Sequence, residues 1–214
     1  MNPTIARGGE RTASTPSFRG GLLSCLVAIG SSLSAQTPCV NGFAGIYPCD
    51  QVDLLSRMTI TQLGGQTNLA DLWGWTDPLT GTEYALVGMR TGTAFVDLSN
   101  PVQPVLTGVL PSHIAGANTL WREVDVIGHY AYVVSETSGH GMQVFNLERL
   151  RTVVSPPQTF TEDAHYAGFS NCHTLFGDDD GFVFGVGTNT ASGGLHVVNV
   201  QNPLVPVLSG TYTL

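Results

Sequence analysis

The sequence predicts an all-β protein, a β-propeller of four-stranded blades, and three observations support this prediction. A unit of about 50 residues recurs after residue 67, and this period is typical of propeller blades. Each copy contains four short stretches with the alternating or short apolar pattern of a β-strand, without a sustained helical period. Glycine accounts for 26 of the 214 residues, as many tight turns between short strands require.

The third and fourth stretches of the unit are the most alike. "TAFVDLSNPVQPVLTG" begins at Thr93, and "LHVVNVQNPLVPVLSG", which begins at Leu195, repeats its pattern. A shorter relative, "MQVFNLERL", begins at Met142. One position of the three copies is always Asp or Asn: Asp97, Asn146 and Asn199. Proline cannot donate to a sheet, so we expect Asn-Pro-x-x-Pro to form the turn before an exposed outer strand.

Two further stretches precede each of these copies. The second strand is predicted at "EYALVG", "HYAYVV" and "GFVFGV", which begin at Glu83, His129 and Gly181. The first strand is predicted at "DLWGW", "TLWREVDV" and "NCHTLF", an alignment that places Trp73, Trp121 and His173 at one position. The middle copy has "PPQTFTE" where the other two have a fourth strand.

The repeats place about three blades, at 68–112, 116–166 and 168–214. One four-stranded sheet cannot bury its apolar face alone, and stacking related units covers it. Closed propellers usually have about four to eight blades. We therefore expect an incomplete propeller from a truncated reading frame. The alternative is a ring that closes with other copies of the chain.

The first 35 residues have the order of an export signal. Three Arg residues precede the apolar stretch "GLLSCLVAIGSSLSA", which ends in small residues. We predict a signal peptide over residues 1–35, with an uncleaved anchor as the alternative. Residues 36–67 then form an N-terminal segment that precedes the repeats. We expect no transmembrane segment in the mature chain. We expect the protein to be secreted or held at the cell surface.

Export exposes the cysteines to an oxidising compartment. Cys39 and Cys49 flank a loop rich in turn-forming residues, and we predict a disulfide between them. Cys172 is left without a partner by this pairing. Its apolar surroundings favour a buried free thiol over a nucleophile.

The charge pattern bears on the class of partner. The formal net charge is −8, and all eight basic residues are Arg. Binding to phosphate backbones or to anionic lipids requires clustered Lys and Arg, so a nucleic-acid partner and a polybasic membrane patch are not expected.

The motifs resemble those of a known family of exported bacterial proteins. They run from "CVNGFAGIYPCDQVDLLS" through "WGWTDPLTGTEYALVG", "GTAFVDLSNPVQPV", "WREVDVIGHYAYVVSE", "GHGMQVFNLERLR" and "TFTEDAHYAGFSNCH" to "GVGTNTASGGLHVVNVQNP". In this order they are similar to the choice-of-anchor B proteins, which are built on LVIVD-type repeats. The resemblance covers nearly all of residues 39–205, the N-terminal part of such a protein.

This resemblance implies a secreted or surface β-propeller. It also implies a longer chain, with further blades and a C-terminal surface anchor. It assigns no catalytic residue, because the family has no established activity. One departure is "NCHTLFGDDDG", where a more apolar strand without cysteine is expected.

The first strand of a propeller blade lines the central channel. Trp73, Trp121, Arg122 and His173 are therefore candidates for a ligand-binding channel mouth that stacks on sugars or flat organic groups. The alternative is that these large side chains fill the tapered centre of the ring.

Histidines suggest a divalent metal as a second kind of site. Imidazole is the commonest transition-metal ligand, and His140, His165 and His173 are the candidate ligands, with His196 also considered. None of them has a close metal-ligand spacing. The "GDDDG" sequence offers carboxylates for Ca²⁺, but it lacks the spaced pattern of a calcium loop and is better explained as a hairpin turn.

Three function hypotheses follow. The first is an extracellular binding module for a protein or glycan. The second is an extracellular hydrolase or lyase with a histidine-lined, metal-dependent site in the channel. A Ser138, His140 and Asp163 set can be assembled on paper, but no nucleophile elbow or nucleotide-binding motif accompanies it. The third is a structural module that self-associates through open edge strands.

Overall fold

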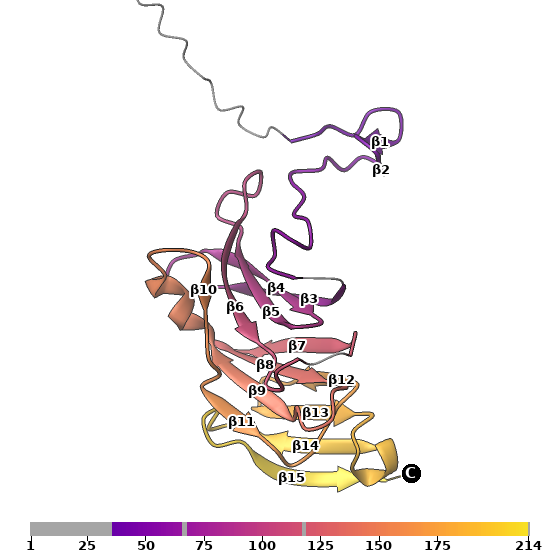
Figure 1. The fold of residues 1–214 in the computed structure, drawn as a ribbon, viewed down its shortest axis with the longest axis vertical. Helices are drawn as coiled ribbons and strands as arrows, with labels where there is room; N and C mark the ends of the chain where they lie inside the picture. Colours follow the sequence, from indigo (N-terminus) through magenta and orange to yellow (C-terminus); the bar gives the residue numbers. More distant parts are fainter. Residues whose placement is uncertain (1–35, 66–67, 117–118, 214) are drawn as a thin grey trace, which may run out of the picture. The chain divides into compact units, whose positions relative to one another are not determined.

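The computed structural model describes residues 36–65, 68–116 and 119–213, and it is all-β, as predicted (Figure 1). Its strands form a two-stranded hairpin and three larger sheets. The predicted signal peptide, residues 1–35, lies outside the described residues. Among the described residues, no helix is both long and apolar enough to cross a membrane.

The first sheet is an antiparallel meander with one strand added at its outer edge. The meander consists of β3 (Leu69–Thr76), β4 (Glu83–Met89), β5 (Gly92–Asp97) and β6 (Val105–Pro111). The added strand is β10 (Gln158–Thr159), which pairs in parallel with β6. β10 lies in the "PPQTFTE" stretch, which the sequence marked as different from the other copies.

The second and third sheets have four strands each. The second contains β7 (Arg122–Ile127), β8 (Tyr130–Ser135), β9 (Met142–Asn146) and β11 (Ala164–Tyr166), with a 3-10 helix, η1 (Leu147–Thr152), after β9. The third contains β12 (Thr174–Gly177), β13 (Phe182–Val186), β14 (Leu195–Asn199) and β15 (Val207–Tyr212), with η2 (Ala191–Gly193) before β14. The chain thus crosses from β9 to the edge of the first sheet before it completes the second.

The repeat position of Asp97, Asn146 and Asn199 is confirmed by the geometry. Each ends the third strand of its sheet. In each, a side-chain oxygen accepts a hydrogen bond from the backbone N–H two residues later, at 2.7, 2.9 and 3.0 Å respectively. Asp and Asn favour this local turn because their short side chains reach their own backbone.

The alignment of the first strands is wrong. Trp73 pairs with Leu86, and the same register position is occupied by Asp125 in the second sheet and by Phe176 in the third. Trp121 and His173 lie before these positions in the chain. The first strands differ in length, and β3 has an irregularity between Leu69 and Asp71, so their sequences alone do not fix the register.

Apolar side chains hold the three sheets together. Leu86 and Phe95 of the first sheet pack with Ala131 and Phe145 of the second. The opposite face of the second sheet, which includes Val144, packs against the third. Such burial contributes about 25 cal/mol for each Å² of apolar surface removed from water, and it is the main force that keeps the sheets stacked.

The first strands converge, because β7 contacts both β3 and β12. Two carboxylates form hydrogen bonds between first strands of adjacent sheets. Asp71 accepts a hydrogen bond from the backbone N–H of Val124 at 2.9 Å. Asp125 accepts one from the backbone N–H of Gly177 at 2.7 Å. These bonds satisfy backbone groups that would otherwise lie unpaired at the strand contacts.

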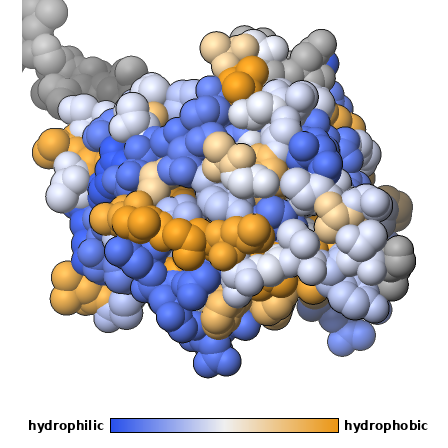
Figure 2. Space-filling view, turned by 90° about the horizontal axis from the view of Figure 1, so that it is seen from below, coloured by the Kyte–Doolittle hydropathy of each residue, from blue (hydrophilic) through white to orange (hydrophobic). Residues whose placement is uncertain are grey.

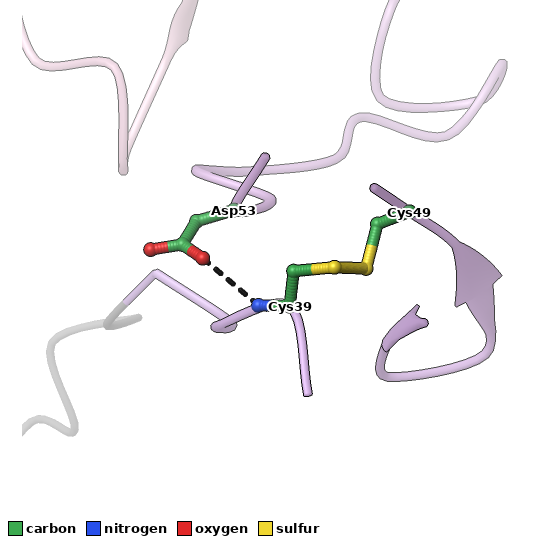
Figure 3. Close-up of a disulfide and its surroundings, with 3 residues drawn as sticks. All are labelled: Cys39, Cys49 and Asp53. Carbon is green, nitrogen blue, oxygen red and sulfur yellow. Dashed lines mark hydrogen bonds between the residues drawn. A yellow bond between two sulfur atoms is a disulfide. The ribbon is translucent and has the colours of Figure 1, made fainter. Parts of the chain in front are cut away.

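The N-terminal segment contains the predicted disulfide. Cys39 and Cys49 are bonded around the hairpin of β1 (Phe43–Ala44) and β2 (Tyr47–Pro48). The backbone N–H of Cys39 also donates to the carboxylate of Asp53 at 2.8 Å (Figure 3). The disulfide is compatible with an oxidising, extracellular setting.

Candidate functional site

A pocket of about 350 Å³ opens between the outer strands of the first and second sheets. Its apolar lining includes Leu110 and Phe160. Its polar lining includes His113, Gln143 and Glu162. A concave site with an apolar floor and a few convergent polar groups is the usual form of a ligand-binding pocket.

β10 explains why residues distant in sequence meet here. His113 follows β6, and Glu162 follows β10. Because β10 pairs with β6, the chain after β10 is carried past the end of the first sheet. His113 Nδ1 consequently donates a hydrogen bond to Glu162 Oε1 at 2.7 Å, although 49 residues separate them.

His165 on β11 completes a cluster with this pair. Its ring lies flat against that of His113, with 3.7 Å between the ring centroids and 4° between the planes. His165 Nε2 donates to the backbone carbonyl of His140 at 2.7 Å, and this contact leaves Nδ1 as the ring nitrogen with a free lone pair. His113, Glu162 and His165 each offer a ligand atom, and these atoms lie within 4.8 Å of one another.

Two oxygen atoms of the pocket lack hydrogen-bond partners. Gln143 is 2% exposed, and its Nε2 donates to the carbonyl of Pro111, but its buried Oε1 has no partner within the described structure. Glu162 Oε2 is also buried without a partner in the same region. Leaving a buried acceptor unpaired costs about 1–3 kcal/mol, so these two oxygens are positions that a water or a ligand would pair.

A buried Arg122–His140 pair lies beside the cluster. Arg122 is 1% exposed; it donates to the carbonyl of Met89 at 2.9 Å and to His140 Nε2 at 2.8 Å. Burial lowers the pKa of Arg122 to about 10. Burial, followed by the charge of Arg122, lowers the pKa of His140 to about 4, so this imidazole is neutral at pH 7. Its Nδ1 donates to the carbonyl of Gly141.

The structure separates the three histidines expected to bind a metal. His165 belongs to the cluster, and His140 supports it through its backbone carbonyl while its side chain faces Arg122. His173 is elsewhere, hydrogen-bonded through Nδ1 to Glu136 at 2.6 Å. His113 was not predicted as a site residue, because no local spacing in the sequence connects it to Glu162.

The four residues predicted to line the channel mouth differ in exposure and position. Trp73 and Trp121 are 44% and 48% exposed, whereas Arg122 is buried. The exposed His173 is connected to the segment before β7, because its partner Glu136 donates its backbone N–H to the carbonyl of Trp121. Glu136 therefore connects the side chain of His173 to the backbone of Trp121, whereas Trp73 lies at a different register position.

The remaining candidates are structural. Ser138 contacts Ser170, and Asp163 binds Arg149, so neither forms a triad with His140. The aspartates of "GDDDG" lie in the turn between β12 and β13, where Asp178 accepts from the backbone N–H of Phe182. Cys172 is a buried free thiol, as expected, and burial raises its pKa to about 12.

Comparison with known families identifies one segment. Residues 82–110, from the start of β4 through most of β6, match the LVIVD repeat. No curated protein matches the chain. The chain therefore contains an LVIVD repeat, and the more specific resemblance to the choice-of-anchor B proteins is not confirmed.

Proposed function

We propose that this chain is an exported LVIVD-repeat β-propeller that acts outside the cell as a binding module. In this proposal the three sheets are blades, at about 68–112, 116–166 and 168–214, and residues 1–35 are the export signal. The LVIVD match, the shared turn geometry and the Cys39–Cys49 disulfide support it. So does the resemblance of the motif order to exported choice-of-anchor B proteins.

The observation that carries the binding role is an exposed apolar face on the third sheet. In the first sheet, Leu86 and Phe95 are paired in register and fully buried against the second sheet. The residues at the same register in the third sheet are Phe184 and Val197, which are only partly buried. Phe176, beside Phe184, is 61% exposed.

The same comparison extends to the outer strand. Gly108 pairs with Phe95, and a Cβ placed on it would lie 2.4 Å from the carbonyl oxygen of Gln158 and from the ring of Phe160. Gly210 pairs with Val197, and a Cβ placed there would meet nothing within 4 Å. The third sheet thus has apolar residues and a glycine at the positions that are packed in the first sheet, but no segment covers them.

Other exposed apolar residues adjoin this face. Val207 and Tyr212 of β15, which pair with Asn199 and Leu195, are each at least half exposed. Figure 2 looks at the molecule from below Figure 1, from the end where β14 and β15 lie, and it shows a band of hydrophobic residues across the middle of this face. Contiguous exposed apolar surface of this kind marks protein–protein contacts. The partner that fits is another apolar sheet face: the next blade of the longer chain that the resemblance implies, or, for residues 1–214 on their own, a second copy of the chain.

Analytical ultracentrifugation over a range of protein concentrations tests this proposal. We expect the wild-type protein to form dimers and Phe176→Asp to remain monomeric at the same concentrations. Val154→Asp is the matched control, because Val154 is 95% exposed outside the strands and should leave the dimer unchanged. A wild-type protein that stays monomeric, or a Phe176→Asp variant that dimerises equally well, would contradict the proposed binding face.

A further inference from the structure

We propose that His113, Glu162 and His165 bind a divalent transition-metal ion, with Zn²⁺ or Co²⁺ as the fitting class. This site lies at the outer strands, away from the apolar face of the third sheet, and it does not depend on the proposed function. Two imidazoles and one carboxylate are a ligand set that proteins use for Zn²⁺ and for related metals.

The ligand atoms are nearly close enough for one ion. They lie within 4.8 Å of one another. In a tetrahedral site with metal–ligand bonds of about 2.1 Å, neighbouring ligand atoms are about 3.4 Å apart. With His165 held on the His140 carbonyl, rotation of Glu162 and of His113, out of its stack on His165, would bring the three ligand atoms to one ion.

A hydrogen bond from a neighbouring residue orients one of the proposed ligands. The bond from His165 Nε2–H to the His140 carbonyl fixes the ring and directs its Nδ1 lone pair away from that contact. Metal-binding histidines characteristically hold their other ring N–H on a carbonyl or carboxylate in this way. An ion can take the place of the proton that joins His113 to Glu162 Oε1.

The two unpaired oxygens are the independent indication of a ligand. A metal ion, or a water bound to it, gives Glu162 Oε2 a partner. Gln143 lines the same pocket, is 98% buried and keeps Oε1 without a donor. Because a water on a metal ion is a strong donor, Gln143 Oε1 is suited to accept its hydrogen bond.

The positive charge of Arg122 favours a metal that binds nitrogen ligands over one that binds only oxygen. Arg122 is hydrogen-bonded to His140, whose carbonyl holds His165, so a positive charge lies close behind the cluster. Ca²⁺ and Mg²⁺ require several oxygen ligands, and one carboxylate beside an arginine does not provide them. An ion that gains from nitrogen ligation can bind here despite that charge.

The test is calorimetric titration of the purified, metal-free full chain, without a histidine tag, with ZnCl₂. Co²⁺ absorption in the visible range provides a spectroscopic signature of nitrogen and oxygen ligation. We expect one ion per chain. His113→Ala, His165→Ala and the nearly isosteric Glu162→Gln should each weaken binding by about tenfold or more.

His173→Ala is the matched control, because His173 also contacts a glutamate, at 2.6 Å, but outside the cluster. It should bind Zn²⁺ as the wild type does. Circular dichroism verifies that each variant is folded, and Glu162→Gln serves if an alanine variant is not. The proposal is overturned if the wild type binds no stoichiometric ion, if Glu162→Gln binds as tightly as the wild type, or if His173→Ala loses binding equally.

Discussion

The carboxylate of Asp125 accepts a hydrogen bond from the backbone N–H of Gly177 at 2.7 Å, and so joins the first strands of the second and third sheets. A second oxygen of the same carboxylate accepts from Val126 N–H. Asp125 is 5% exposed, and burial raises its pKa. The contact between these sheets therefore depends in part on one buried acidic side chain.

Asp125→Ala should lower the free energy of unfolding by about 1–3 kcal/mol, because it leaves two backbone N–H groups without an acceptor. Asp125→Asn should cost less, since the amide oxygen still accepts one bond. Urea unfolding followed by circular dichroism measures both. Asp179→Ala, in the exposed turn before β13, is the control and should stay within about 0.5 kcal/mol of the wild type.

The three repeated turns should be energetically similar. Asp97→Ala, Asn146→Ala and Asn199→Ala each remove one side-chain acceptor for the backbone N–H two residues later. We expect each to destabilise the protein by about 1 kcal/mol, the usual contribution of such a bond. Urea midpoints of the three variants test this, and a silent substitution at one turn beside an unfolded protein at another would disprove their equivalence.

Two glycines at the same register should respond in opposite ways. Gly108→Ala should destabilise the protein by about 1–3 kcal/mol, because its Cβ collides with Gln158 and Phe160. Gly210→Ala should be neutral or stabilising by up to about 1 kcal/mol, since the site is open and glycine weakens a strand. Thermal unfolding of the two variants, at concentrations where the protein is monomeric, gives the comparison. Equal losses at both positions would mean that the space beside Gly210 is filled.

Stability should fall as the pH decreases from 6.5 towards 4, in part because of His140. Its pKa in the folded protein is about 4, below its ordinary value of 6.5, so the unfolded chain takes up the proton first. The stabilisation is complete above pH 6.5 and decreases by up to about 3 kcal/mol on the way down to pH 4. Urea unfolding at several pH values, for wild type and His140→Asn, isolates this contribution. The two curves should differ in slope between pH 6.5 and 4, and parallel curves would contradict the assignment.

The sequence was sufficient where strand and turn chemistry is local. The Asp97, Asn146 and Asn199 position could be aligned because each residue bonds its own neighbouring backbone. The Cys39–Cys49 disulfide was predictable from a short loop between two cysteines in a chain whose sequence predicts export. Trp73 was misaligned because the register of a first strand is set by pairing with the second, which adjacent sequence does not encode.

The His113–Glu162–His165 cluster could not be read from the chain. His113 and Glu162 meet only because β10 pairs with a strand of the preceding sheet. The one available signal was that the middle copy replaces the fourth-strand motif with "PPQTFTE". A departure from a repeat marked the segment that builds the site, although it did not reveal where that segment goes.

β10 has a consequence for how the protein opens. It belongs in sequence to the second sheet, yet it covers the outer edge of the first, and Phe160 after it packs with Phe95 and Phe145. Neither sheet can detach without breaking the crossover. Amide hydrogens of β5 and β9 should therefore exchange with solvent together, in one cooperative opening, while those of β14 and β15 exchange sooner and independently.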